Sequence, residues 1–188
     1  MSVLATDNFN RSDGAAGANW TTVDHFSGGA GMVIDSNNLR GNGATWCFGY
    51  YSGVATPDQH HYSQVLAPTS GLYYGPAVRC SGTDGSTANW VGWHNNGEIW
   101  KSVNGITTQI GTAATFTTND IVKLEANGTS YTPYKNGVAG TPVTDSSLSG
   151  GTFGVFAYSV SGRFDDFEGG DYGVGGGVNT NLFFRRRR

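Results

Sequence analysis

The chain has 188 residues, of which 30 are Gly and only 13% are Asp, Glu, Lys or Arg. A chain of this length favours a single domain, and the lack of a long apolar run excludes a membrane-spanning helix. The N-terminus shows no basic region followed by an apolar stretch, so no signal peptide is predicted. The aromatic residues, 5 Trp, 9 Tyr and 10 Phe, suffice for a large core between two sheets.

Five Asn-Gly dipeptides begin at Asn42, Asn96, Asn104, Asn127 and Asn136. Asn and Gly tolerate the positive φ that a two-residue hairpin turn requires, so each dipeptide predicts a hairpin. The spacing of eight or nine residues between neighbouring turns leaves room for a strand of about six residues and none for a helix. The pattern is typical of an antiparallel, all-β protein.

Strand-like segments follow one another along the chain, and helical periodicity is absent. About thirteen strands exceed a comfortable single sheet, which favours two packed antiparallel sheets. The predicted strands lie within residues 3–9, 20–23, 31–35, 38–41, 45–51, 61–67, 72–80, 89–111 (three strands), 121–144 (hairpins around two turns), 152–159 and 162–169.

The two cysteines, Cys47 and Cys80, both lie in strand-like runs. We predict free, buried thiols that behave as small apolar residues, with a disulfide as the alternative. The four histidines are too scattered in sequence to indicate a metal cluster.

The hairpin around Asn96 carries the candidate binding residues. A two-residue turn would place Trp93 opposite Trp100, on one face with Glu98 and Gln109. Flat aromatic rings among polar side chains resemble a platform for stacking a sugar ring. The competing and favoured interpretation is that this face packs on the second sheet, since a sandwich needs its large aromatics inside. The opposite face is predicted to belong to the core, and it carries Trp90, His94, Ile99, Val103, Ile106 and Ile110.

The C-terminal segment differs in composition from the rest. Residues 1–168 form the predicted domain, and a Gly-rich tether begins at residue 169. The tether leads to an apolar and then basic peptide that we predict docks on a partner, made of Leu182, Phe183, Phe184, Arg185, Arg186, Arg187 and Arg188. Without those arginines 7 basic and 14 acidic residues remain, so the body carries a net charge of about −7.

Several segments share the pattern of one known family, namely residues 7–14, Asn19 and Trp20, 123–129, 134–138, 144–148, 150–155 and 164–167. They resemble concanavalin A-like (laminin-G-like) jelly rolls. The resemblance covers residues 3–168 and implies a two-sheet jelly-roll sandwich whose first and last strands lie side by side.

The resemblance implies several functions, because this fold serves lectins, adhesion modules, enzymes and structural proteins. Small leaderless members are similar to virion proteins of tailed phages, so we predict a non-enzymatic capsid-decoration or tail-associated module in the virion, made in the host cytoplasm. Its partners would be other virion proteins or copies of itself. The alternative is a carbohydrate-binding adhesion module, extracellular or at a cell surface.

An enzyme of this fold is the weakest alternative. A glycosidase needs two carboxylates that flank the sugar bond, and the Glu-x-Asp-x-Glu motif usual in such enzymes is missing. Asp166 and Glu168 would share a strand face at about 6.7 Å, but we predict no catalytic residue. The resemblance also makes a structural calcium a candidate, with Asp7, Asp13 and Asp166 as ligands if the termini pair. No other cofactor and no membrane partner is predicted, and the acidic body argues against nucleic-acid binding.

Overall fold

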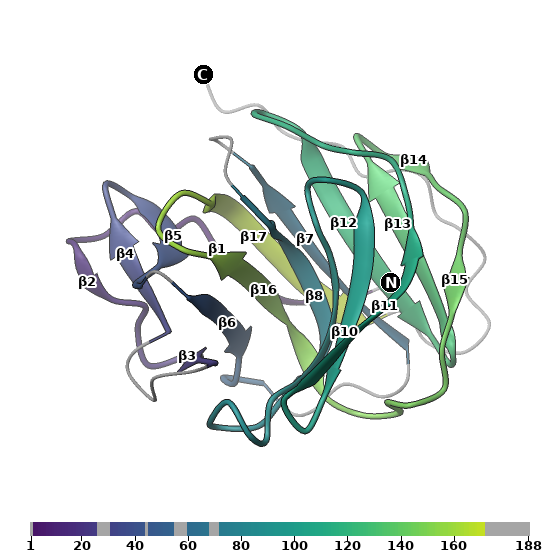
Figure 1. Ribbon diagram of the computed structural model, residues 1–188. Helices are drawn as coiled ribbons and strands as arrows, with labels where there is room; N and C mark the ends of the chain where they lie inside the picture. Colours follow the sequence, from purple (N-terminus) through teal and green to yellow (C-terminus); the bar gives the residue numbers. More distant parts are fainter. Residues whose placement is uncertain (1, 26–30, 44, 55–59, 68–71, 172–188) are drawn as a thin grey trace.

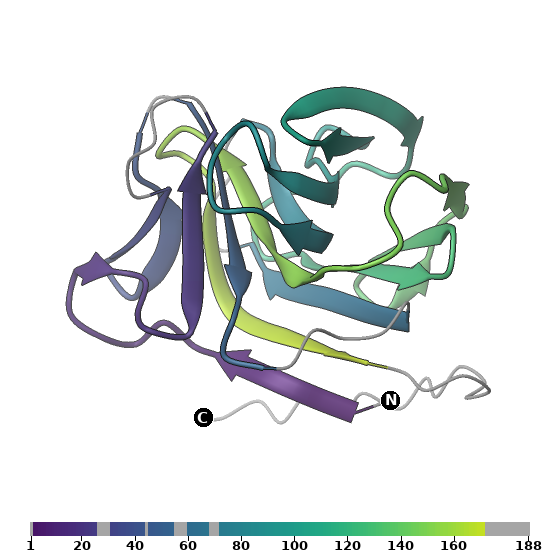
Figure 2. The ribbon, with the colours of Figure 1, turned by 90° about the horizontal axis from the view of Figure 1, so that it is seen from below.

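The computed structural model describes residues 2–25, 31–43, 45–54, 60–67 and 72–171, and for His60 the backbone only. All strand pairings in these residues are antiparallel, and the strands form two sheets packed as layers (Figures 1 and 2). No helix is assigned in the described residues, and hence none there could cross a bilayer. The predicted all-β, two-sheet antiparallel sandwich is confirmed.

One sheet has ten strands in the order β14-β13-β12-β7-β17-β5-β4-β2, with β1 pairing with β17 and β15 pairing with β13. Its strands are β1 (Ser2–Asp7), β2 (Gly14–Ala15), β4 (Met32–Asp35), β5 (Asn38–Gly41), β7 (His60–Leu66), β12 (Ile121–Asn127), β13 (Ser130–Lys135), β14 (Val138–Ala139), β15 (Val143–Thr144) and β17 (Arg163–Asp171).

The other sheet has seven strands in the order β11-β10-β9-β8-β16-β6-β3. Its strands are β3 (Trp20–Asp24), β6 (Trp46–Tyr51), β8 (Tyr74–Ser81), β9 (Asn89–Trp93), β10 (Glu98–Val103), β11 (Ile106–Thr112) and β16 (Thr152–Tyr158).

The two terminal strands lie side by side, as expected (Figure 2). In this pair Ser2 faces Asp171, and Asp7 faces Phe167. Because β17 continues to Asp171, the first three residues of the predicted tether belong to the sheet. Residues 172–188, with the predicted docking peptide, lie outside the described residues.

The seven-stranded sheet has aromatic side chains on both faces. Its inner face joins the ten-stranded sheet in the main core, where Cys47, Trp93 and Val155 are buried with Val65 and Leu124. Its outer face carries a second, smaller cluster made of Val23, Phe48, Ala77, Cys80, Ala88, Trp90 and Phe156. Neighbouring residues such as Cys47 and Phe48 alternate between the faces, as the pleat of a strand requires. Both thiols are buried and free, as predicted.

The Asn-Gly dipeptides do not all form the same turn. Asn104-Gly105 has φ of 47° and 77°, and Asn136-Gly137 has φ of 50° and 83°, the positive pairs expected of two-residue turns. Asn127 itself pairs with Ser130, so the two loop residues are 128 and 129 and not 127 and 128. Asn42-Gly43 follows β5 and precedes β6, so it connects the two sheets and does not close a hairpin.

Candidate functional site

The loop between β9 and β10 decides which side chains reach the outer face. His94 N–H donates to Glu98 O (2.8 Å), and Gly97 N–H donates to His94 O (2.9 Å). These bonds enclose a three-residue loop, with Gly97 at φ +92°, the position that a left-handed glycine takes in such hairpins. The loop is one residue longer than the predicted two-residue turn.

That extra residue shifts the register of the hairpin by one. Trp93 pairs with Ile99, while Trp100 pairs with Gly92. A one-residue slip moves a side chain to the other face of a strand, so Trp93 and Trp100 lie on opposite faces. The predicted platform that joined these two indoles is therefore wrong.

Trp93 belongs to the main core. It is 1% exposed, its Nε1–H donates to Ala114 O (3.1 Å), and its ring meets Phe116 edge-on with the centroids 4.9 Å apart. Gln109 faces Trp100 across β10 and β11, but it is exposed and does not line the pocket described below. The favoured interpretation, packing between the sheets, thus holds for Trp93 alone.

The predicted core face of the hairpin also needs correction. Trp90 and His94 lie on the outer face, and Ile106 is exposed in the turn region. Ile99 is in the main core, as predicted, and Ile110 packs against it while partly buried. Ile110 lies at an irregularity of the strand pair, where Ile99 pairs with Gly111 and Trp100 pairs with Gln109.

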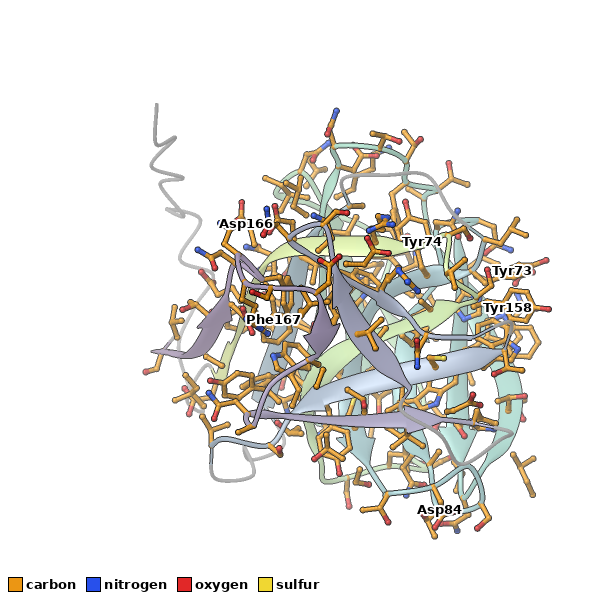
Figure 3. The ribbon with its side chains drawn as sticks, turned by 90° about the vertical axis from the view of Figure 1, so that its left-hand side faces the viewer. Tyr73, Tyr74, Asp84, Tyr158, Asp166 and Phe167 are labelled. Atoms are coloured by element: carbon orange, nitrogen blue, oxygen red, sulfur yellow. The ribbon has the colours of Figure 1, made fainter. Side chains whose placement is uncertain are left out.

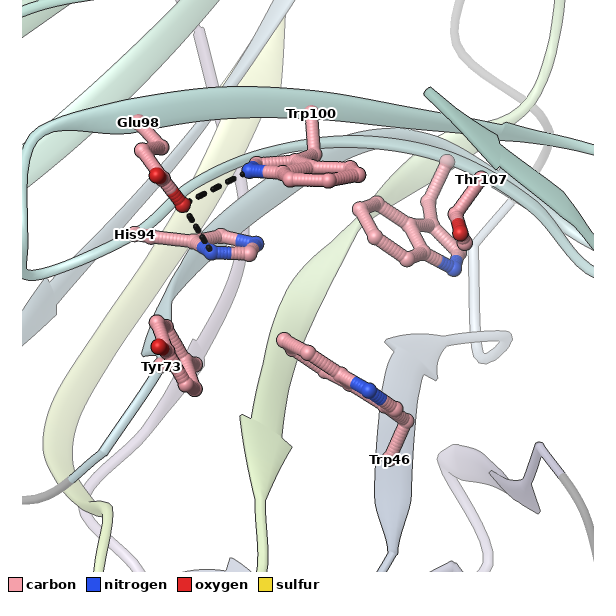
Figure 4. A pocket seen from close by; sticks show the side chains of 7 residues that line it. Trp46, Tyr73, His94, Glu98, Trp100 and Thr107 are labelled. Carbon is pink, nitrogen blue, oxygen red and sulfur yellow. Dashed lines mark hydrogen bonds and ion pairs between the residues drawn. The ribbon is translucent and has the colours of Figure 1, made fainter. Parts of the chain in front are cut away.

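A pocket of about 370 Å³ opens on the outer face of the seven-stranded sheet (Figure 4). Two of its residues, Glu98 and Trp100, were predicted as binding residues. The pocket draws side chains from β6, β9, β10 and β11 and from the segment before β8. It is lined by Trp46, Tyr73, Trp90, His94, Glu98, Trp100 and Thr107.

Aromatic rings form most of the pocket wall. His94 lies between Trp100, whose ring is parallel to it within 9° at 6.0 Å, and Tyr73 at 5.8 Å (Figure 4). Trp46 lies 5.3 Å from His94 and 5.7 Å from Tyr73. Tyr158 packs edge-on against Trp46 at 5.2 Å. Several ring faces and edges thus converge on one space.

The ring of Phe156 from β16 packs against two of the residues that line the pocket. This ring stacks on Trp90 at 5.4 Å, with an interplanar angle of 4°, and lies 4.6 Å from His94. Gly92 lies between Trp90 and His94 in sequence, and a Cβ there would come within 2.5 Å of the Phe156 ring. Glycine at this position therefore lets the ring settle against the sheet.

Two polar side chains face the aromatic rings. Trp100 Nε1–H donates to Glu98 Oε2 (2.9 Å), and hydrogen bonds from Asn96 and Trp100 lower the pKa of Glu98. His94 is 2% exposed, and neither of its ring nitrogens has a hydrogen-bond partner among the described residues. Burial lowers the pKa of His94 to about 3, so the imidazole is neutral at pH 7 although Nδ1 lies 4.0 Å from the Glu98 carboxylate.

The candidate calcium ligands have other partners. Asp7 forms an ion pair with Arg11 (2.7 Å) and accepts from Trp20 Nε1 (2.8 Å), and Asp13 accepts from the backbone N–H of Ser36 (2.8 Å). Across the described ranges, no three His, Cys, Asp or Glu residues gather where a metal ion could bind. The structure therefore does not bring Asp7, Asp13 and Asp166 together as a ligand set.

Asp166 and Glu168 do not share a regular strand face. The register between β17 and β7 shifts between Asp165 and Glu168, and Asp166 has φ +44°. Glu168 accepts from Tyr62 Oη (2.8 Å). Asp166 lies well apart from Tyr73 and Tyr158 of the aromatic region (Figure 3), and neither carboxylate lines the pocket.

The sequence contains two signals for the missed residues. Trp46 alternates with Phe48 and Tyr50 along β6, and an aromatic residue at every second position indicates a strand with one aromatic face. Asn95-Asn96-Gly97 also fits a three-residue loop that ends in a left-handed glycine. That register would have placed Trp90 and His94 beside Trp100.

No protein-family model and no curated protein matches the sequence. Solved structures with low identity do match. The carbohydrate-binding module CBM66 from Bacillus subtilis is 17% identical with a TM-score of 0.60, over 81% of this chain and 94% of that one.

A protein of unknown function with a galectin-like fold, also from Bacillus subtilis, is 11% identical with a TM-score of 0.62, over 91% and 96% of the two chains. The exoplasmic/lumenal domain of VIP36, in its Ca²⁺/Man3GlcNAc-bound form, is 9% identical with a TM-score of 0.52, over 85% and 87%. The chain has the concanavalin A-like, galectin-like β-sandwich fold.

Proposed function

We propose that this protein is a non-catalytic carbohydrate-binding module and that the aromatic pocket holds the sugar. The observation that carries the proposal is the convergence of Trp46, Tyr73 and Trp100 with Glu98 and His94 on one pocket. Its volume of about 370 Å³ lies at the small end of the range for ligand pockets. A site of this size suits one or two sugar residues.

The chemistry of the wall matches the two kinds of surface that a sugar presents. The C–H groups of a pyranose face pack well against an indole or phenol ring, which has a negative face. The hydroxyl groups need hydrogen-bond partners, and the partly exposed Glu98 carboxylate accepts hydrogen bonds. His94 is 2% exposed and both of its ring nitrogens are buried, so the imidazole contributes a ring to the wall.

The carboxylate inventory favours binding over hydrolysis. A glycosidase of the usual kind places two carboxyl groups on either side of the scissile bond. Within the described residues that line the pocket, Glu98 is the single carboxylate. The fold is shared with a carbohydrate-binding module and with a glycan-bound lumenal domain, which adds support from analogy only.

A glycan array followed by calorimetric titration tests the proposal. Tyr73 is 38% exposed and Trp100 is half-buried, so Tyr73→Ala and Trp100→Ala should fold and yet weaken binding at least about ten-fold, roughly 1.4 kcal/mol. Val138→Ala changes a side chain that is 73% exposed on β14 and should bind as the unmodified protein does. A folded protein that retains no glycan, or pocket variants with unchanged affinity, would reject the proposal.

The virion module stays a prediction. It depends on the docking peptide, which lies outside the described residues, and it is compatible with glycan binding by the domain. If mass spectrometry finds no such polypeptide in purified phage particles, the virion prediction is contradicted. Deletion of residues 178–188 should leave the domain folded and prevent attachment to the partner.

A further inference from the structure

Glu98 is an ionised carboxylate at the edge of the pocket, and no Lys or Arg of the described residues pairs with it. It lies beside His94, which is uncharged at pH 7 because burial lowers the pKa of its imidazole. By contrast, Asp7, Asp35 and Asp145 are each paired with an Arg or a Lys. The side chain of Glu98 is 33% exposed, so a ligand can reach it.

The basic residue next to Trp100 in sequence does not neutralise this carboxylate. Lys101 follows Trp100 in β10, and its Nζ forms an ion pair with Asp145 (2.6 Å). Successive strand residues point to opposite faces, so Lys101 is directed away from the pocket. The lining residues in the described structure include no Lys or Arg.

No Lys or Arg in the part of the chain that the structure describes lies over a ring of the pocket. The cation–π contacts found in the described residues involve the rings of Phe9, Tyr62, Tyr131 and Tyr134, all outside the pocket. A cation over Trp or Tyr is attracted by the negative ring face, most strongly over Trp. Trp46, Tyr73 and Trp100 thus offer such faces beside an unneutralised carboxylate.

We propose that the pocket selects by charge, preferring a sugar residue that carries an ammonium group and rejecting one that carries a carboxylate. The inference rests on the proposed carbohydrate binding and names the class of sugar. The sugar ring packs on the indole and phenol rings, and Glu98 binds the ammonium group. The body is acidic, with a net charge of about −7 without the terminal arginines. Its long-range field also attracts cationic sugars and repels anionic ones.

The test is a titration of the full-length protein with matched methyl pyranosides. Each of the gluco, galacto and manno series provides a neutral sugar, its 2-amino-2-deoxy analogue and its uronate, so that charge changes on an unchanged ring. In the series that binds best, we expect the amino sugar to bind about five-fold more tightly than the neutral sugar, and the uronate at least about five-fold more weakly. The amine preference should vanish at a pH where the ammonium group of the probe is deprotonated.

Glu98→Gln provides the matched variant. The Gln amide oxygen can still accept from Trp100 Nε1–H, while the negative charge is removed. We expect the variant to bind all three charge forms within about two-fold of one another, whatever its affinity for the neutral sugar.

The possible outcomes separate this inference from the proposed function. Binding of neutral sugars with no charge preference, or a preference that persists in Glu98→Gln, overturns the charge selection and leaves carbohydrate binding in place. Failure of every pyranoside and of the glycan array to bind the folded protein overturns both. Binding of a simple quaternary ammonium ion as tightly as the amino sugar would show that the sugar ring contributes nothing, and would also overturn the inference.

Discussion

The two faces of the β9–β10 hairpin use the same residue type for different purposes. On the inner face the Trp93 indole is fully enclosed, with its N–H bonded to Ala114 O and its ring against Phe116. On the outer face the Trp100 indole is half-buried, with its N–H bonded to Glu98 and its ring over His94. The comparison indicates that the face of the sheet, which loop length sets, decides whether a tryptophan stabilises the fold or forms a site.

The largest expected effect comes from the inner face. Trp93→Ala removes a fully enclosed indole and leaves a cavity between the sheets, which should lower the free energy of unfolding by about 3–5 kcal/mol. Trp100→Ala should cost about 1 kcal/mol, because its ring remains partly in contact with water. Denaturant unfolding of both variants measures the difference. Equal losses would contradict the assignment of the two indoles to different faces.

The second prediction concerns the loop that sets the register. A Cβ at Gly97 would lie 2.6 Å from Ala113 O in a residue at φ +92°, so Gly97→Ala combines backbone strain with a collision and should cost about 2 kcal/mol or more. Gly137→Ala is the control, since φ is +83° there and nothing lies within 4 Å of the added Cβ. This variant has backbone strain but no collision, so it should lose less stability, about 1 kcal/mol. If Gly137→Ala loses as much stability, the contact with Ala113 does not matter.

Much of the fold could be predicted from local signals. Closely spaced Asn-Gly dipeptides predicted the strands within residues 89–111 and 121–144, which form hairpins in two different sheets. The pairing of β1 with β17 followed from the family resemblance. Turn type was the weak point, because Asn96-Gly97 fits both a two-residue turn and the end of a three-residue loop. Only tertiary packing distinguishes them: Ala113 N–H donates to Gly97 O (2.6 Å), which ties the loop to the segment after β11.

Only part of the candidate site was predicted, and the length of the loop is again the cause. Glu98 and Trp100 follow the loop, and the prediction placed them together on one face. The favoured interpretation packed that face on the second sheet, whereas the structure has Glu98 and Trp100 at the pocket on the outer face. Trp90 and His94 precede the loop, and the one-residue error moved both into the core. Tyr73 and Trp46 come from distant segments, and no local pattern could bring them to this hairpin.

The third prediction uses the buried imidazole of the outer face. Burial depresses the pKa of His94 to about 3, whereas an unfolded histidine titrates near 6.5. Between these values the unfolded chain binds more protons than the folded one, so the contribution of His94 makes stability fall as pH drops from about 6.5 to about 3. The slope approaches about 1.4 kcal/mol per pH unit.

His94→Phe isolates this effect. The substitution keeps an aromatic ring between Trp100 and Tyr73 but removes the titrating nitrogens. Its unfolding free energy should depend less on pH over the same window than that of the unmodified protein. The Glu98 carboxylate, which faces His94, is present in both proteins. Its titration therefore does not account for the difference, and parallel pH profiles would refute the neutral, buried state of His94.

The smallest expected effect on stability is that of Glu98, at the edge of the outer face. Glu98→Gln keeps an acceptor for Trp100 Nε1–H and should change the unfolding free energy by no more than about 0.5 kcal/mol. Glu98→Ala removes the acceptor, and the half-exposed indole N–H can turn to water, so the loss should stay below about 1 kcal/mol.

Ligand binding should respond in the opposite order to stability, with Glu98 and Trp100 variants losing affinity or selectivity while remaining folded. Paired unfolding and titration measurements on the same variants check this order. A Glu98 variant that unfolds as readily as Trp93→Ala would mean that the outer face, too, is built for stability and that the pocket is a gap in packing.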